Sequence, residues 1–140
     1  MPEGPEIRRA ADALAQVLVG SPLVRIDYRV PQLQRRARAL RGVAVQRVYA
    51  RSKALLIEYD CGLTHYSHNQ LYGAWRIRLA GDPPDARRVV RVELATPTHV
   101  ATLYSATQVE LLDAHELAAH PYLARLGPDV LDPATTVATL

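Results

Sequence analysis

The chain has 140 residues, of which 49% are hydrophobic, and a formal net charge of +3. A chain of this size fits one domain and can bury roughly two thirds of its unfolded surface. No apolar run approaches the roughly 20 residues of a bilayer span, and the N-terminus lacks the basic and apolar segments of a signal peptide. The single cysteine, Cys61, excludes an internal disulfide and a multi-cysteine zinc site made by this chain alone. We therefore expect a cytoplasmic protein without membrane association.

The first predicted element is an amphipathic helix over residues 5–19. Pro5 suits a first helical position, and Gly20 and Pro22 end the pattern. Between them apolar residues recur at helical spacing, namely Ile7, Ala10, Ala11, Leu14, Val17 and Leu18.

From residue 24 the apolar period becomes two, which predicts a strand over 24–30 with one solvated face. Further strands are expected at 43–50, 53–59, 63–68, 74–80, 87–95 and 99–105, separated by turn residues. Many short strands at regular spacing are typical of a sandwich or barrel. The expected fold is mainly β with flanking helices: a two-layer β-sandwich or flattened barrel preceded by an N-terminal α-helix.

The C-terminal part has a different character. Residues 114–126 predict one or two short helical turns broken at Pro121, and the segment 127–133 holds two prolines and has no periodicity. We expect a domain over residues 1–126 and a connector over 127–140.

Basic residues are concentrated in the first third of the chain. Residues 25–53 hold nine basic residues, Arg35 and Arg36 among them, against one acid, whereas 107–140 hold five acids and one arginine. A polyanion would bind the basic segment, although such segments are often only solvated faces. Sixteen of the 17 basic residues are arginine, so Lys53 is the single compact ammonium.

The N-terminus offers a nucleophile. Proline after the initiator methionine is easily unmasked, and its secondary amine would have a pKa of about 8, so that part of it is unprotonated at neutral pH. Such an amine at Pro2 can attack a sugar's anomeric carbon, with Glu3 as general acid and base and Glu6 close by. The same residues are also a good helix-start signal.

Five ordered motifs carry a family resemblance. The motifs MPEGPEI, RSKALL, YSHNQLYG, YSA and HPYLARLGPDVLDP together resemble the N-terminal domain of the formamidopyrimidine-DNA glycosylase and endonuclease VIII family, over essentially all 140 residues. The resemblance implies that Pro2 is the Schiff-base nucleophile, Glu3 the acid and base, and Glu6 a supporting carboxylate. It implies that Lys53 approaches the damaged nucleotide and its flanking phosphate.

The resemblance also implies a wedge that enters the duplex when the damaged base is flipped out. Gln70, Leu71 and Tyr72 would form it, since a wedge needs an apolar group to replace lost stacking and a polar group for the orphaned base. Without the resemblance, Leu71 and Tyr72 would be interpreted as hairpin residues on a core. Arg35 and Arg36, in the basic segment, are candidate DNA contacts.

The resemblance implies a bifunctional glycosylase and apurinic-site lyase acting on damaged double-stranded DNA. Gly4 and the Gln-Leu-Tyr wedge are closer to endonuclease VIII, which favours oxidised pyrimidines over oxidised purines as substrates. Full-length relatives continue into a helix-two-turn-helix domain and a zinc finger, so zinc is expected only there and no metal or small-molecule cofactor in this chain. Two alternatives stay open: a truncated, catalytically impaired DNA-binding domain, and a structural remnant. The oligomeric state is left open.

Overall fold

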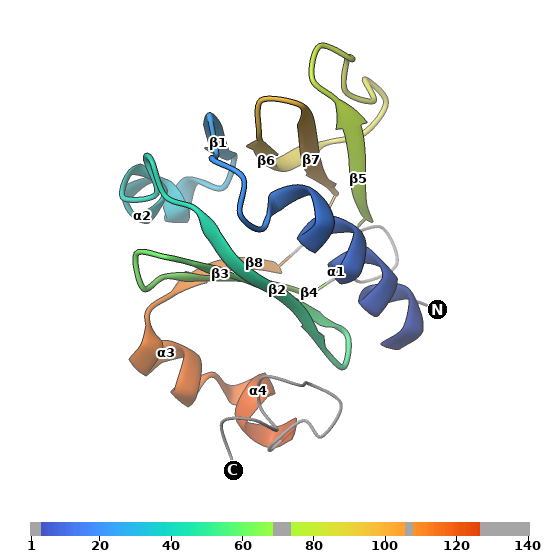
Figure 1. Ribbon diagram of the computed structural model, residues 1–140. Coiled ribbons are helices and arrows are strands. Elements are labelled where there is room, and N and C mark those ends of the chain that lie inside the picture. Colours follow the sequence, from blue (N-terminus) through green and yellow to red (C-terminus); the bar gives the residue numbers. More distant parts are fainter. Residues whose placement is uncertain (1–3, 69–73, 106–107, 127–140) are drawn as a thin grey trace.

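The computed structural model describes residues 4–68, 74–105 and 108–126, and it contains two four-stranded antiparallel sheets with helices around them (Figure 1). The predicted N-terminal helix is confirmed as α1, Gly4–Leu18. The strands are β1 (Arg25–Tyr28), β2 (Val45–Arg51), β3 (Ala54–Tyr59), β4 (Thr64–His68), β5 (Ala74–Leu79), β6 (Val90–Ala95), β7 (His99–Tyr104) and β8 (Gln108–Leu112). The remaining helices are the 3-10 helix η1 (Pro31–Leu33), α2 (Gln34–Arg38), α3 (Ala114–Ala119) and α4 (Pro121–Leu126).

The sheets have the strand orders β1-β6-β7-β5 and β2-β3-β4-β8, with antiparallel pairing throughout. No pairing joins the two sheets among the described strands, so the sandwich predicted from the sequence is confirmed and the flattened barrel is wrong. None of the helices in the described part of the chain is long and apolar enough to cross a membrane.

The main core lies between the two sheets. Because successive side chains of a strand point to opposite faces, Leu55, Ile57 and Tyr59 of β3 enter this core, together with Val92 and Leu94 of β6. Each of the leucines, fully shielded from solvent, stabilises the fold by about 1.5–3 kcal/mol relative to an exposed position.

A second, smaller core lies on the other face of the β2-β3-β4-β8 sheet. Ala54 and Leu56, which alternate with the residues of the main core, pack there with Tyr66 of β4 and Leu123 of α4. The sheet is therefore covered on both faces, which explains why β3 is apolar on both sides.

Helix α1 packs along β2 and fixes which ends of the two elements meet. Its buried stripe is Ile7, Ala11, Leu14 and Leu18, and directly after it Val19 forms a parallel bridge with Val45 at the start of β2. The C-terminal end of α1 thus lies beside the start of β2. The N-terminal end of α1 consequently lies toward the end of β2, as Figure 1 shows.

Three elements were not predicted: the short helices η1 and α2, and strand β8. Helix α2 has only five residues and no apolar period of its own; its position is fixed by Gln34, whose side-chain amide donates to the carbonyl of Tyr28. Strand β8 is apolar on both faces at its end, with Leu111 in the main core and Leu112 in the second core, so strict alternation fails. The predicted break at Pro121 is confirmed, because His120 before it has extended backbone between α3 and α4.

Candidate active site at the Lys53 hairpin

Lys53 lies in the tight turn between β2 and β3, as predicted. Arg51 and Ala54 form the last pair of this hairpin, and Ser52 between them has φ 54°, in the left-handed region. The backbone N–H of Lys53 donates to the hydroxyl of Tyr122 on α4 at 3.4 Å. Lys53 is half-buried, and no carboxylate among the described residues pairs with its ammonium. The charge is therefore available to an incoming anion.

His68 is a neighbour of Lys53 through the sheet. Its position at the end of β4 pairs with Ala54, the residue after Lys53, and its ring meets that of Tyr122 edge to face with 4.9 Å between centroids. Burial, and then the charge of Lys53, lower the pKa of His68. His68 is accordingly neutral at neutral pH, and an anion bound between it and Lys53 would favour its protonated form.

The start of α1 lies at this same end of the molecule (Figure 1). Free N–H groups at the beginning of a helix carry a positive partial charge, which adds to that of Lys53. Pro2 and Glu3, which directly precede α1, lie outside the described residues, as does the side chain of Glu6. The helix start and Lys53 thus place two positive features toward the end of the molecule where the predicted nucleophile precedes α1.

The predicted wedge residues Gln70, Leu71 and Tyr72 also lie outside the described residues. The flanking elements nevertheless bracket them: β4 ends at His68 and β5 begins at Ala74. In the sequence, the wedge begins two residues after His68, the neighbour of Lys53.

An aromatic cavity of about 420 Å³ opens beside His68, between the second sheet and α4. The rings of Tyr66 and His120 contact each other at a tilt of 39° with 4.3 Å between centroids, and Nε2 of His120 lies 3.4 Å from a carboxylate oxygen of Glu110. The Nδ1 atoms of His68 and His120 are buried without a hydrogen-bond partner within the described structure. The remaining lining residues are Gln108, Pro121 and Tyr122.

The two predicted arginine contacts lie elsewhere, on α2. Arg36 donates to the carbonyl of Leu111 at 2.7 Å and forms an ion pair with Glu116, and the Glu116 carboxylate raises the pKa of Arg36. Leu111 is near the end of β8 that is remote from His68, because Gln108 at the other end pairs with His68. Arg36 thus holds α2 to α3, and neither it nor the exposed Arg35 is brought to Lys53.

Sequence reasoning gave no role to His68 or Tyr122, although both lie in quoted motifs. Their proximity depends on the pairing of β3 with β4 and on the packing of α4, which residue spacing does not reveal. Cys61 is exposed, and no group of three or more His, Cys, Asp or Glu side chains in the described segments could hold a metal ion.

Known proteins resemble this chain in sequence and in fold. Residues 1–118 match the family model described as formamidopyrimidine-DNA glycosylase N-terminal domain. The chain is 51% identical over 132 residues to an endonuclease 8 of Klebsiella pneumoniae, covering 94% of this chain and 50% of the relative, and 50% identical over 136 residues to one from Escherichia coli, covering 97% and 52%. It thus spans about half the length of the curated relatives it matches.

Two solved structures share the fold at low sequence identity. A structure of MutM in complex with DNA containing carbocyclic 8-oxo-G superposes with a TM-score of 0.74 at 19% identity, covering 89% of this chain and 49% of that one. The formamidopyrimidine-DNA glycosylase of Lactococcus lactis, bound non-covalently to DNA with an AP site, gives the same values.

Proposed function

Because the chain belongs to the formamidopyrimidine-DNA glycosylase N-terminal domain family, we propose that it carries the catalytic residues of a base-excision DNA glycosylase with apurinic-site lyase activity. Its substrate would be damaged double-stranded DNA, with oxidised pyrimidines favoured over oxidised purines. Relatives about 50% identical to the chain are named endonuclease 8, which supports the preference for oxidised pyrimidines. Its location in the cytoplasm stays a prediction.

The observation that carries the proposal is that the Lys53 turn and the start of α1 lie toward the same end of the molecule. A glycosylase of this kind must bind the anionic DNA backbone while an amine reaches the sugar. The Lys53 ammonium and the N-terminal end of α1 would both attract that backbone. Lys53 would bind the phosphate beside the damaged nucleotide, and neutral His68 would donate a further hydrogen bond to it.

The proposed reaction begins after removal of Met1. The secondary amine of Pro2 attacks the anomeric carbon of the sugar, the N-glycosidic bond breaks, and the base leaves with a proton from solvent or a carboxyl group. Glu3 transfers protons as the sugar ring opens and the iminium forms. Glu6, at the same helix start, would assist Glu3 as a second carboxylate. Loss of a proton from the sugar then expels the 3′ phosphate by β-elimination, and a second loss expels the 5′ phosphate by δ-elimination.

This reaction needs neither a metal ion nor an organic cofactor from the chain, because the nucleophile is the protein's own amine. The wedge of Gln70, Leu71 and Tyr72 would fill the space left by the flipped nucleotide. Arg35, exposed on α2, would add a phosphate contact outside the active end, whereas Arg36 is engaged by Glu116.

The experiment is a strand-cleavage assay on matched duplexes that contain thymine glycol, 8-oxoguanine or no lesion. The proposal expects cleavage with thymine glycol fastest and the undamaged duplex intact. Binding that weakens steeply with salt, but without cleavage of any duplex, would instead identify the DNA-binding domain without activity. If the protein neither binds nor cleaves any of the duplexes, both the glycosylase and the inactive DNA-binding domain are overturned.

A further inference from the structure

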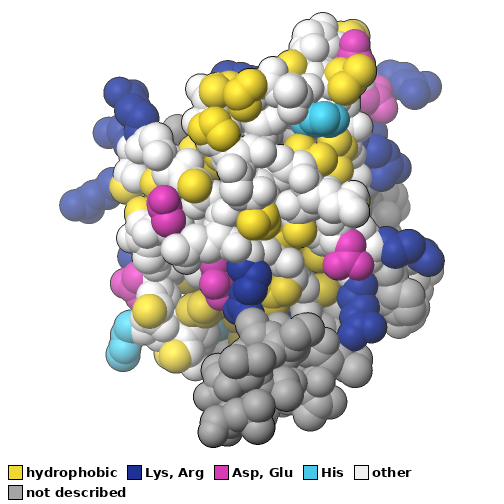
Figure 2. Space-filling view, viewed as in Figure 1, with side chains coloured by type: hydrophobic (Ala, Val, Ile, Leu, Met, Phe, Trp, Pro, Cys, Tyr) yellow, Lys and Arg dark blue, Asp and Glu magenta, His cyan; other side chains and the backbone are white. Residues whose placement is uncertain are grey.

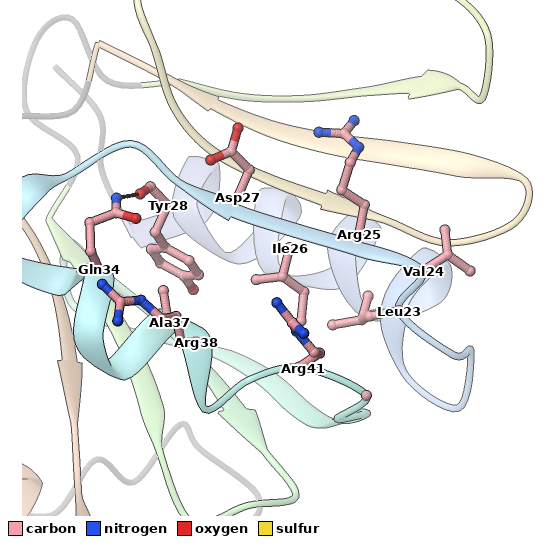
Figure 3. Close-up of a pocket in the computed structure, with 11 residues that line it drawn as sticks. Leu23, Val24, Arg25, Ile26, Asp27, Tyr28, Gln34, Ala37, Arg38 and Arg41 are labelled. Carbon is pink, nitrogen blue, oxygen red and sulfur yellow. Dashed lines mark hydrogen bonds between the residues drawn. The ribbon is translucent and has the colours of Figure 1, made fainter.

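A second cleft lies between strand β1 and helix α2, at the end of the molecule opposite Lys53. It has a volume of about 280 Å³ and is drawn in Figure 3. Pro22 pairs with Ala44, just before β2 begins, whereas Lys53 follows the end of β2. The seven residues of that strand separate the two sites by about 23 Å. This cleft therefore takes no part in the proposed glycosylase chemistry.

The cleft combines an apolar floor with a basic rim. Leu23, Ile26 and Ala37 form the floor, and Arg38 and Arg41 stand over it, exposed. Neither arginine has a hydrogen-bond or ion-pair partner within the described part of the chain. Figure 2 shows basic side chains projecting at the edge of the molecule where α2 lies. The rim thus offers two uncompensated charges beside an apolar surface.

One wall of the cleft is the free edge of a sheet. β1 is an edge strand and pairs only with β6 among the described strands. Arg29 N–H donates to the carbonyl of Arg91, so by antiparallel alternation the backbone groups of Asp27 and Arg25 also face β6. The backbone groups of Ile26 and Tyr28 then face the cleft. The carbonyl of Tyr28 is already taken by Gln34, which confirms this assignment and leaves Ile26 open.

We propose that this cleft binds an extended acidic peptide segment of a partner protein by adding it as a strand along β1. The peptide's backbone pairs with the N–H and C=O of Ile26, and one apolar side chain enters the floor. Carboxylates two residues before and after it, which share its face of the strand, meet Arg38 and Arg41. Strand addition of this kind draws affinity from backbone hydrogen bonds and specificity from alternate side chains.

Nucleic acid fits the cleft less well. A phosphodiester backbone would use the two arginines but has no N–H and C=O pair for Ile26 and no aliphatic side chain for the floor. A peptide with an apolar residue and acidic residues two positions from it uses all three features, and the charge of the rim selects acids over bases.

The test uses a fluorescein-labelled synthetic peptide in which a central isoleucine has an aspartate two residues before it and another two residues after it, with threonine at the positions between. It is titrated with the full chain at low and physiological salt. Exchange of both rim charges, Arg38→Glu with Arg41→Glu, should weaken binding by about tenfold or more. The matched control exchanges two exposed arginines at the opposite side of the same sheet, Arg76→Glu with Arg87→Glu, and has the same net charge. It should bind the peptide almost as well as the unchanged chain.

Amide NMR on the unchanged chain separates strand addition from simple charge attraction. The proposal expects the Ile26 amide signal to shift and its exchange with solvent to slow when the peptide is added. Equal weakening by both double variants, or an unchanged Ile26 amide at saturating peptide, would overturn it. Displacement of the peptide by a short single-stranded oligonucleotide that reproduces the arginine dependence would overturn it too, in favour of a nucleic-acid contact.

Discussion

Replacement of Glu93 by alanine should cost the protein a large part of its stability. Glu93 lies on β6, only 4% exposed, and accepts hydrogen bonds from Arg25 at 2.7 Å and Arg78 at 2.9 Å. The Arg78 side chain is 16% exposed, so removal of the carboxylate leaves a largely buried guanidinium without its counter-charge, although it still donates to the Asp82 carbonyl and the Thr102 hydroxyl.

The size of the effect follows from the exposure of the two arginines. Removing one partner of a buried ion pair costs about 3–5 kcal/mol. The Arg25 side chain is 48% exposed and can turn to water, so we expect the lower end, about 3 kcal/mol. For a chain of this length that corresponds to a fall of roughly 10 °C in Tm.

Urea denaturation measures this directly, because Trp75 is the single tryptophan and is buried in the main core, where its fluorescence reports unfolding. The matched control is Glu58→Ala, which removes a half-exposed pair with Arg47 and should cost about 0.2–1 kcal/mol. If Glu93→Ala is no more destabilising than this control, the buried pair does not stabilise the fold as argued.

The same pair has a defined pH dependence. Burial raises the pKa of Glu93, but the hydrogen bonds and charges of Arg25 and Arg78 outweigh it and hold the pKa below its ordinary value. The folded state therefore binds a proton less readily than the unfolded state. The stability difference between the unchanged chain and Glu93→Ala should be constant above pH of about 5 and shrink as the pH falls through the folded pKa.

Three further predictions concern the active end and the core. Lys53→Ala should reduce base excision more than strand cleavage at a preformed abasic site, since elimination depends chiefly on Pro2 and Glu3; equal loss in gel assays of the two substrates would contradict the role given to Lys53. Lys53→Met should raise the pKa of His68 in an NMR titration, yet leave it below its ordinary value because burial is the larger cause; an unchanged pKa would show that the two groups do not interact. Burial lowers the pKa of His65 to about 3, so between that pH and a pH of about 6 the unfolded state binds more protons than the folded state. In this range the free energy of unfolding should fall by up to about 1.4 kcal/mol for each unit by which the pH is lowered. His65→Gln should reduce that slope, and an identical slope in urea titrations would refute the assignment.

The strands were predictable where one face is apolar and the other polar. β1 alternates Ile26 and Tyr28 with Arg25 and Asp27, and the structure places these pairs on opposite faces, as Figure 3 shows. The alternation of apolar and polar residues gives no information where both faces of a strand are buried. Strand β8 was not predicted for this reason, because Leu111 and Leu112 at its end are both buried, on opposite faces.

The core also contains a polar chain that no periodicity could indicate. The Tyr28 hydroxyl lies 2.6 Å from that of Tyr59 and 2.8 Å from Nδ1 of His65, which joins three strands from both sheets inside the apolar layer. Each of these residues lies at an inward-facing strand position in the sequence. Only the packing of the two sheets brings their polar atoms together.

The candidate site shows a similar division. That Lys53 lies on a turn was predictable from the sequence, because apolar strand patterns stand on both sides of it. That His68 and Tyr122 surround it was not, because the contact depends on strand register and on the packing of a helix almost seventy residues away. The arginines of α2 were predicted to contact DNA, and that prediction stays a prediction. The structure adds that Arg36 forms an ion pair with Glu116, which residue type alone does not reveal.

The most direct test of the central claim is borohydride trapping on an oligonucleotide with an abasic site. Protein from which Met1 has been removed should form a covalent adduct, and digestion followed by mass spectrometry should place the sugar on the nitrogen of Pro2. The same protein acetylated at its N-terminus should form none. An adduct on a lysine, an adduct that survives acetylation, or no adduct with the processed protein would contradict the assignment of Pro2 as the nucleophile.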